Sequence, residues 1–201
     1  MSSDQVKNKK AKLTLVAIIV VSVLPIAAAY FMFFTGIGVP DHTVNKGLLL
    51  PKAIPLEEIV DTEFSNELNQ NKKWRLLLPV PAQCTEQCQK NLYTTRQVHI
   101  RLGEKGLRLE RIAANLNGIE GEAYLASIQS EHPKLKTFTV DKQIWNDWVK
   151  QSGLALDMQQ EHYYFLVDQQ SFAMMAYTNK QHGNDLLKDI KRALKHSIDY
   201  Q

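Results

Sequence analysis

The sequence lacks the short motifs that identify several large enzyme classes. It contains no G-x-S-x-G nucleophile elbow, no H-E-x-x-H metal motif, no P-loop and no G-x-G-x-x-G dinucleotide fingerprint. Internal repeats and low-complexity tracts are also missing. Motif-based assignment to the hydrolases, zinc peptidases, nucleotide hydrolases and dehydrogenases that carry these signatures is therefore excluded.

The chain also lacks a concentration of charge of one sign along most of its length. Its 201 residues carry 24 basic and 21 acidic side chains, with a formal net charge of +3. Nucleic-acid-binding proteins usually gather their basic residues into one patch, so we expect no nucleic-acid partner. With 44% hydrophobic residues, a chain of this length supports one domain plus appendages.

Charge is absent altogether from residues 13–34, which read LTLVAIIVVSVLPIAAAYFMFF. About 20 apolar residues span the ~30 Å hydrocarbon core of a bilayer, so this run predicts a transmembrane helix with a kink at Pro25. Four lysines precede the run and only Lys46 follows it closely, which places residues 1–12 in the cytoplasm and the remainder on the far side. The alternative is a cleaved signal peptide, although the apolar run continues past its small-residue site at 27–29.

The remainder of the chain divides into an approach segment and a domain. Residues 35–70 contain several glycines and prolines that interrupt long elements, and they predict a tether. We expect the domain over residues 71–201, with strands at 74–81, 107–116, 162–168 and 171–178, a short extended piece at 136–141, and helices at 85–102, 122–131, 142–152 and 185–196. This order predicts an α/β, thioredoxin-like domain, with helices on both faces of its sheet, behind a single N-terminal transmembrane helix.

Cysteine is scarce, and the two cysteines of the chain stand together. Cys84 and Cys88 follow the first predicted strand and open the first long helix, where the helix N-terminus stabilises a thiolate. Their C-x-x-x-C spacing differs from the C-x-x-C of redox enzymes and puts both sulfurs on one helix face. Such a pair can exchange disulfides, bind a soft ion such as Cu(I), or form a structural disulfide.

Proline is missing between Gly153 and Asp168, where thioredoxin-like redox enzymes usually carry a cis-proline beside the cysteine pair. Gln83 also stands where those enzymes usually have a tryptophan. We therefore expect an assembly factor rather than an enzyme. If the protein is an enzyme, the expected activity is that of a thiol–disulfide oxidoreductase using Cys84 and Cys88.

The anchor, the Cys84–Cys88 motif, the "YYFLVD" strand and the "DLLKDIKRALK" helix together resemble the Sco family. These are thioredoxin-like copper chaperones of cytochrome c oxidase assembly, and the chain is most similar to a branch of proteobacterial membrane proteins that accompany oxidase genes. The resemblance implies copper bound by Cys84 and Cys88, with His162 as the third ligand. It further implies a cytochrome oxidase subunit or another assembly factor as partner, besides the lipid bilayer. The implied location is the bacterial inner membrane, with a periplasmic domain.

The sequence departs from the Sco pattern around these positions. Thr85 and Gln89 follow the two cysteines where the family usually has prolines, and His162 lies closer to Asp168 than the family histidine does. Three hypotheses therefore stay open: a copper-handling accessory protein, a thiol–disulfide reductant or redox sensor, and a scaffold that binds no metal.

Overall fold

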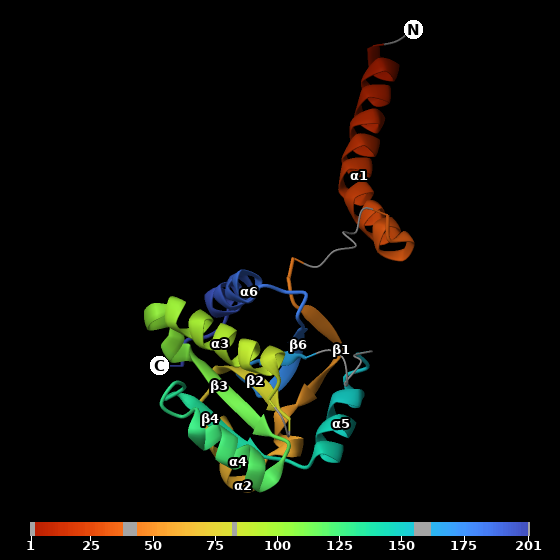
Figure 1. Cartoon of the computed structure of the whole chain (residues 1–201). Helices are drawn as coiled ribbons and strands as arrows, with labels where there is room; N and C mark the ends of the chain where they lie inside the picture. Colours follow the sequence, from red (N-terminus) through yellow and green to blue (C-terminus); the bar gives the residue numbers. More distant parts are fainter. Residues whose placement is uncertain (1–2, 38–43, 82–83, 155–161, 201) are drawn as a thin grey trace. The chain divides into compact units, whose positions relative to one another are not determined.

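The structure is a computed structural model that describes residues 3–37, 44–81, 84–154 and 162–200, and it divides into two compact units. The first unit contains one helix, α1 (Ser3–Thr35), which runs through Pro25 (Figure 1). Its stretch Lys12–Thr35 is long and apolar enough to cross a membrane, and none of it is buried within the protein. A helix that is apolar on all sides and has no protein cover is typical of a membrane span.

The second unit, residues 45–201, is built on a six-stranded sheet in the order β1-β6-β5-β2-β3-β4. The strands β2, β3 and β4 are parallel, β5 is antiparallel to β2, and β6 pairs with both β5 and β1 in antiparallel fashion. Their bounds are β1 (Leu48–Pro55), β2 (Trp74–Val80), β3 (Leu109–Asn115), β4 (Leu135–Thr139), β5 (Tyr164–Val167) and β6 (Phe172–Tyr177).

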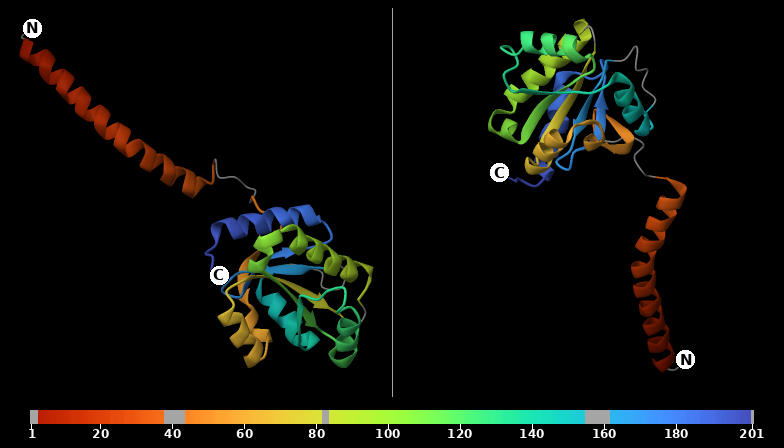
Figure 2. Two further views of the ribbon diagram at one scale, coloured as in Figure 1. Left: turned by 90° about the vertical axis from the view of Figure 1, so that its left-hand side faces the viewer. Right: turned by 90° about the horizontal axis from the view of Figure 1, so that it is seen from below.

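Helices cover both faces of this sheet, as the sequence predicts. Figure 2 shows α3 and α6 on one side and α2 and α5 on the other. Alternate residues of a strand point to opposite faces, so Leu76 and Leu78 of β2 pack in the cluster beneath α3 and α6, whereas Leu77 packs in the cluster that holds Trp145 and Trp148 of α5. The helical elements are α2 (Thr62–Gln70), α3 (Glu86–Arg101), α4 (Gly118–Ser127), α5 (Lys142–Gln151) and α6 (Gly183–His196), with short 3-10 turns η1 (Leu56–Ile59) and η2 (Gly103–Arg108).

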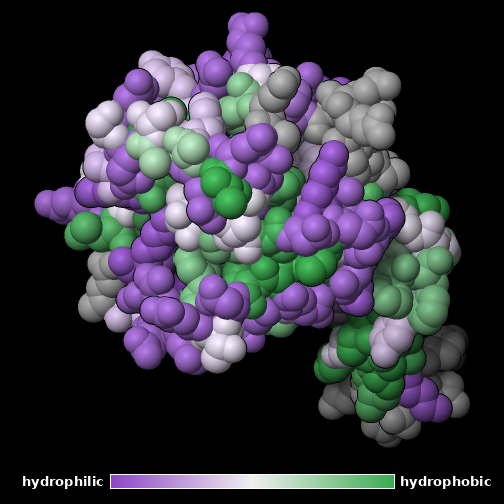
Figure 3. All heavy atoms as spheres, turned by 60° about the horizontal axis from the view of Figure 1, so that its bottom comes forward, coloured by the Kyte–Doolittle hydropathy of each residue, from purple (hydrophilic) through white to green (hydrophobic). Residues whose placement is uncertain are grey.

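The surface of the domain is mainly hydrophilic on the face drawn in Figure 3, where a group of apolar side chains lies near the centre. The interior contrasts with it, since both clusters consist largely of fully buried aliphatic and aromatic residues. Burial of this apolar area supplies most of the favourable free energy of folding.

The domain begins earlier than residue 71, because its compact unit starts at Asn45 and includes β1, η1 and α2. The prolines of this stretch predict a tether, but β1 is an edge strand, where proline is tolerated. Its pairing with β6 is interrupted between Leu49 and Ile54, the interval that contains Pro51. Residues 45–70 therefore belong to the fold.

The turn before α4 explains why this helix begins at Gly118 rather than at residue 122. Asn115, the last residue of β3, donates from Nδ2 to the carbonyl of Gly118 (2.7 Å) and accepts at Oδ1 from the amide of Asn117 (3.0 Å). The same Oδ1 would lie 1.8 Å from a Cβ placed on Gly121. The Asn115 side chain therefore fills the space beside α4 and sets the start of the helix.

Asp189 of α6 ties the beginning of the domain to its C-terminal helix. This residue is 2% exposed, and its Oδ2 accepts from the amides of Lys46 and Gly47 (2.8 Å each) and from the Tyr177 hydroxyl (3.1 Å). Burial, and then the neighbouring Asp189 carboxylate, raises the pKa of Tyr177 far above its ordinary value. Tyr177 therefore remains a hydrogen-bond donor to Asp189.

Candidate thiol site

Cys84 and Cys88 lie where the chain leaves β2 and enters α3, as the sequence predicts. Thr85 is the N-cap residue of α3, and Cys88 is its third residue. The two sulfurs form a disulfide, with the Cα atoms 5.2 Å apart, which is within the ordinary range for disulfides. After reduction, the dipole and the unpaired amides at this helix end would stabilise a thiolate.

The two cysteines differ in their access to solvent. Cys88 is 4% exposed and belongs to the core beneath α3, whereas Cys84 is partly exposed. An attacking thiolate therefore reaches Cys84 first and releases Cys88 as the leaving group. Because Cys88 lies within the first turn of α3, the released thiolate is stabilised, which favours exchange at Cys84.

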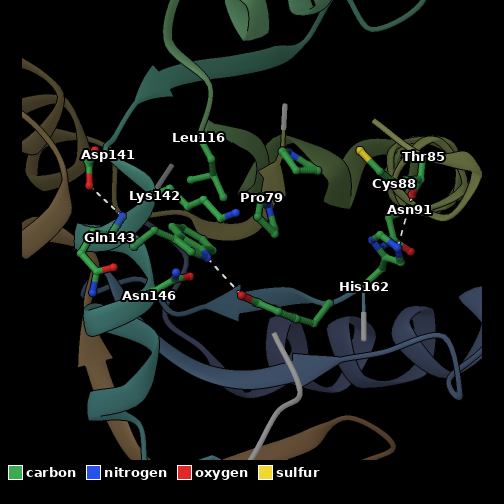
Figure 4. A pocket seen from close by; sticks show the side chains of 13 residues that line it. Pro79, Thr85, Cys88, Asn91, Leu116, Asp141, Lys142, Gln143, Asn146 and His162 are labelled. Atoms are coloured by element: carbon green, nitrogen blue, oxygen red, sulfur yellow. Dashed lines mark hydrogen bonds between the residues drawn. The ribbon is translucent and has the colours of Figure 1, made fainter. Parts of the chain in front are cut away.

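His162 faces the start of the cysteine helix from the segment just before β5. Its Nε2 lies 3.3 Å from the hydroxyl oxygen of Thr85 (Figure 4). The Thr85 side chain makes no capping hydrogen bond to α3, so its hydroxyl is available to His162. Since β5 begins at Tyr164, His162 lies outside the strand.

Gln89 also makes a contact at the site. Its Nε2 donates to the carbonyl oxygen of Cys84 at 3.2 Å, across the turn that the disulfide closes. Thr85 and Gln89 are the two residues that stand where Sco proteins usually have prolines. In the sequence they stand out only as departures from the Sco pattern. Both residues are polar, and in the structure both form side-chain hydrogen bonds at the site.

A cleft of about 810 Å³ opens beside these residues. In Figure 4 Cys88, Thr85 and His162 lie at one end, with Asp141, Gln143 and Asn146 at the other. Tyr163 also lines the cleft, and burial raises its pKa to about 12, so it stays protonated at neutral pH. The remaining lining residues are Pro79, Pro81, Asn91, Leu116, Lys142 and Trp145.

The residues present fit a metal ion only in part. Within the described ranges, no group of three His, Cys, Asp or Glu side chains is arranged to hold a metal, and the cysteines are oxidised. Reduction would supply two soft thiolates, and His162, which lines the same cleft as Cys88, would add an imidazole. This donor set suits Cu(I), but Cys84, Cys88 and His162 stay a prediction as ligands.

The other histidines of the described ranges do not approach this cleft. His99 and His132 lie beside a different cavity near the C-terminal end of α3, and His182 and His196 lie at the two ends of α6. His42 is outside the described residues. His162 is therefore the histidine of the described part that lines the thiol cleft.

Comparisons with known proteins identify the fold. Solved structures that match the chain include copper-bound ScoI of Arabidopsis thaliana (TM-score 0.55, 10% identity, covering 74% of this chain and 99% of that one) and apo Sco1 of Thermus thermophilus (0.55, 12%, 76% and 99%). Copper-bound yeast Sco1 also matches (0.53, 14%, 76% and 96%).

No curated protein matches the chain. The profile of the family described as transmembrane-like, thioredoxin-like, C-terminal domain matches residues 74–197. The protein therefore belongs to this family, and its domain has the Sco-like thioredoxin fold.

Proposed function

We propose that the protein is a membrane-anchored, Sco-like accessory protein of cytochrome c oxidase assembly that carries copper on Cys84 and Cys88. The observation that carries the proposal is the position of the cysteine pair at the N-terminus of α3, with His162 Nε2 3.3 Å from Thr85, the residue that follows Cys84. Two thiolates and an imidazole form a soft donor set that favours Cu(I). Two of the Sco structures with a similar fold contain bound copper.

Loading with copper requires prior reduction of the disulfide. A dithiol of a partner protein would attack Cys84, release the Cys88 thiolate, and then resolve the mixed disulfide with its second sulfur. The partner leaves as a disulfide, and this protein gains two electrons and the protons of two thiols. Binding of Cu(I) then displaces those protons, so copper occupancy would depend on both redox state and pH.

The anchor would keep this chemistry near a membrane-embedded partner. We propose a single pass through the bacterial inner membrane, with residues 1–12 cytoplasmic and the domain periplasmic, because lysines 7, 9, 10 and 12 precede the apolar helix. The proposed partner is a cytochrome oxidase subunit or another assembly factor. Protease added to spheroplasts should digest the domain, and its protection would contradict this orientation.

Cu(I) titration of the full chain in detergent micelles tests the copper proposal. Under anaerobic, reducing conditions and with a competing chelator, we expect one Cu(I) per chain, lost in the Cys84→Ser/Cys88→Ser variant. His162→Ala should weaken binding, whereas His196→Ala, at the exposed end of α6, should leave it unchanged. Binding no stronger than in the double-serine variant would refute copper carriage by these cysteines.

The disulfide favours a second function, that of a thiol–disulfide reductant or redox sensor. The pair is oxidised, and the partly exposed Cys84 offers a point of attack. The reduction potential distinguishes this function from a scaffold with an idle disulfide, because structural disulfides usually lie below about −300 mV. Equilibration with glutathione buffers measures it, and a potential above about −300 mV without Cu(I) binding would favour the redox role.

A further inference from the structure

A second cavity, of about 540 Å³, lies beside the C-terminal half of α3. Its walls come from α3, from the η2 turn, from β3, and from the segment between α4 and β4. None of Cys84, Cys88 and His162 lines this cavity, so it is separate from the thiol cleft. The lining residues that matter for its chemistry are Arg96, Ile100, Leu107, Arg111, Glu131 and Lys134.

Arg111 of β3 brings a buried positive charge to this cavity without a negative partner. It is 2% exposed, and its three hydrogen-bond acceptors are the Thr95 hydroxyl (3.2 Å from Nε), the Leu92 carbonyl (2.8 Å from Nη2) and His132 Nδ1 (3.3 Å from Nη2). In the part of the chain that the structure describes, no carboxylate pairs with Arg111 and its Nη1 donates no hydrogen bond. Buried arginines are almost always paired with an anion.

The neighbouring charges increase the deficit of negative charge. Arg96 lines the same cavity, and its Nε is buried without a partner among the described residues. Lys134 also lines it and forms no ion pair within the described ranges. Glu131 is the carboxylate in the lining; its side chain is 70% exposed and lies 4.0 Å from Arg96 Nη1. The lining thus contains three cationic side chains, Arg96, Arg111 and Lys134, and one carboxylate that is largely exposed to solvent.

The protonation states at neutral pH preserve this imbalance. Burial, and then the charge of Arg96, lowers the pKa of Arg111 to about 10, so the guanidinium stays charged. Burial and the charges of Arg111 and Arg96 lower the pKa of His132. His132 is therefore neutral, and its Nδ1 accepts from Arg111 rather than adding a further charge.

We propose that this cavity binds an oxyanion, a phosphate or carboxylate group, which supplies the counter-charge that Arg111 lacks. The Nη1 of Arg111 can donate charge-assisted hydrogen bonds to an oxygen of such a group, while the Thr95, Leu92 and His132 acceptors hold the guanidinium plane in place. Arg96 and Lys134 stand beside it as further donors. Ile100 and Leu107, which are 64% and 59% exposed, add apolar surface next to the charges. The oxyanion can thus be free in solution or be carried on an apolar body, as in a phospholipid headgroup.

Calorimetric titration of the full chain in a neutral detergent tests this proposal at constant ionic strength. The two probes are inorganic phosphate and dihexanoyl phosphatidylglycerol. We expect saturable binding of at least one probe. Equal affinities would identify the free oxyanion as the ligand, and tighter binding of the lipid would identify a headgroup whose acyl chains use Ile100 and Leu107. No saturable binding of either probe would overturn the proposal.

Variants assign the binding to the cavity. Arg96→Gln/Lys134→Gln should weaken binding by at least about tenfold, because both substitutions remove charged donors that face the oxyanion. The matched control is Lys90→Gln/Lys188→Gln, which removes the same net charge from exposed positions of α3 and α6 outside the cavity. These four residues avoid the fully buried Arg111, whose replacement threatens folding itself. If the control variant weakens binding equally, the loss of affinity comes from the change in net charge, and the proposed binding site is contradicted.

Discussion

The hydroxyl oxygen of Thr85 lies 3.3 Å from Nε2 of His162. This pair joins two segments that are 77 positions apart in the sequence, the N-terminus of the cysteine helix and the approach to β5. Thr85 stands between the cysteines in the chain, so the residue that follows Cys84 also contacts the imidazole. The contact places His162 next to the N-terminus of the cysteine helix, in the lining of the cleft that Cys88 also lines.

Thr85→Val should release His162 without weakening the domain. Valine keeps the shape of threonine but removes the hydroxyl, and Thr85 is exposed, so the free energy of unfolding should change by less than about 0.5 kcal/mol. The ring nitrogen signals of His162 in ¹⁵N NMR spectra should shift. Thr85→Ser, which retains the hydroxyl, should leave them in place. Identical spectra for the valine and serine variants would contradict the contact.

Cys84 should react before Cys88 when the disulfide is opened. Cys88 is 4% exposed whereas Cys84 is partly exposed, and reactivity of cysteines follows both access and thiolate character. We expect iodoacetamide to modify Cys84 about tenfold faster than Cys88 in the reduced protein. Peptide mass spectrometry after short reaction times measures both rates. Equal rates would contradict a preferred entry at Cys84, and a faster Cys88 would assign the entry point for thiol exchange to that sulfur.

The stability of the domain should fall as the pH drops below about 6.5, the ordinary pKa of histidine. Burial lowers the pKa of His132 and of His99, so the unfolded chain binds more protons than the folded one. The stabilisation is complete above the unfolded pKa and is lost progressively below it, by at most about 1.4 kcal/mol per pH unit for each histidine. Urea unfolding between pH 5 and 8, in buffers without phosphate, measures the slope.

His132→Gln serves as the diagnostic variant for this pH dependence. Glutamine cannot titrate, yet its carbonyl oxygen can still accept from Arg111, so the slope below pH 6.5 should decrease. His196→Gln, at an exposed position, should retain the full slope. An unchanged slope in His132→Gln would place the responsible proton elsewhere.

Asp189→Ala should destabilise the domain by about 2–4 kcal/mol, because it leaves two main-chain amides and a buried hydroxyl without their acceptor. Those donors are the amides of Lys46 and Gly47 and the hydroxyl of Tyr177. Urea unfolding gives the free energy, and faster hydrogen exchange at the two amides would localise the loss. Tyr177→Phe removes one donor and should cost about 1 kcal/mol. If Asp189→Ala destabilises the domain no more than Tyr177→Phe does, the two amides do not depend on this carboxylate.

The elements from Trp74 onward could be predicted because their hydrophobic patterns are strong. The run WRLLLPV is β2, and the spacing of Leu186, Leu187, Ile190 and Leu194 is that of the buried face of α6. β1 could not be predicted as part of the sheet, since Pro51 and Pro55 usually interrupt strands. Its place at the edge, where an amide need not pair, depends on the tertiary arrangement.

The candidate site was predictable in its position but not in its contacts. A strand followed by Cys84 and Cys88 at a helix start is a local pattern, so the sequence alone indicates it. The approach of His162 to Thr85 joins distant segments, and no local pattern encodes it. Arg111 was missed for a different reason: in an imperfectly alternating strand, one arginine suggests a solvated face, whereas the structure buries it against α3.

Asn115 and Gly121 occupy one shared space, because any Cβ at position 121 would lie 1.8 Å from Asn115 Oδ1. A change at either position therefore alters the space that is available at the other. A side chain at position 121 requires the Asn115 carboxamide to move away or to be shortened, and either change gives up the hydrogen bonds that hold the turn before α4. Among descendants of this chain, the two sites should therefore covary.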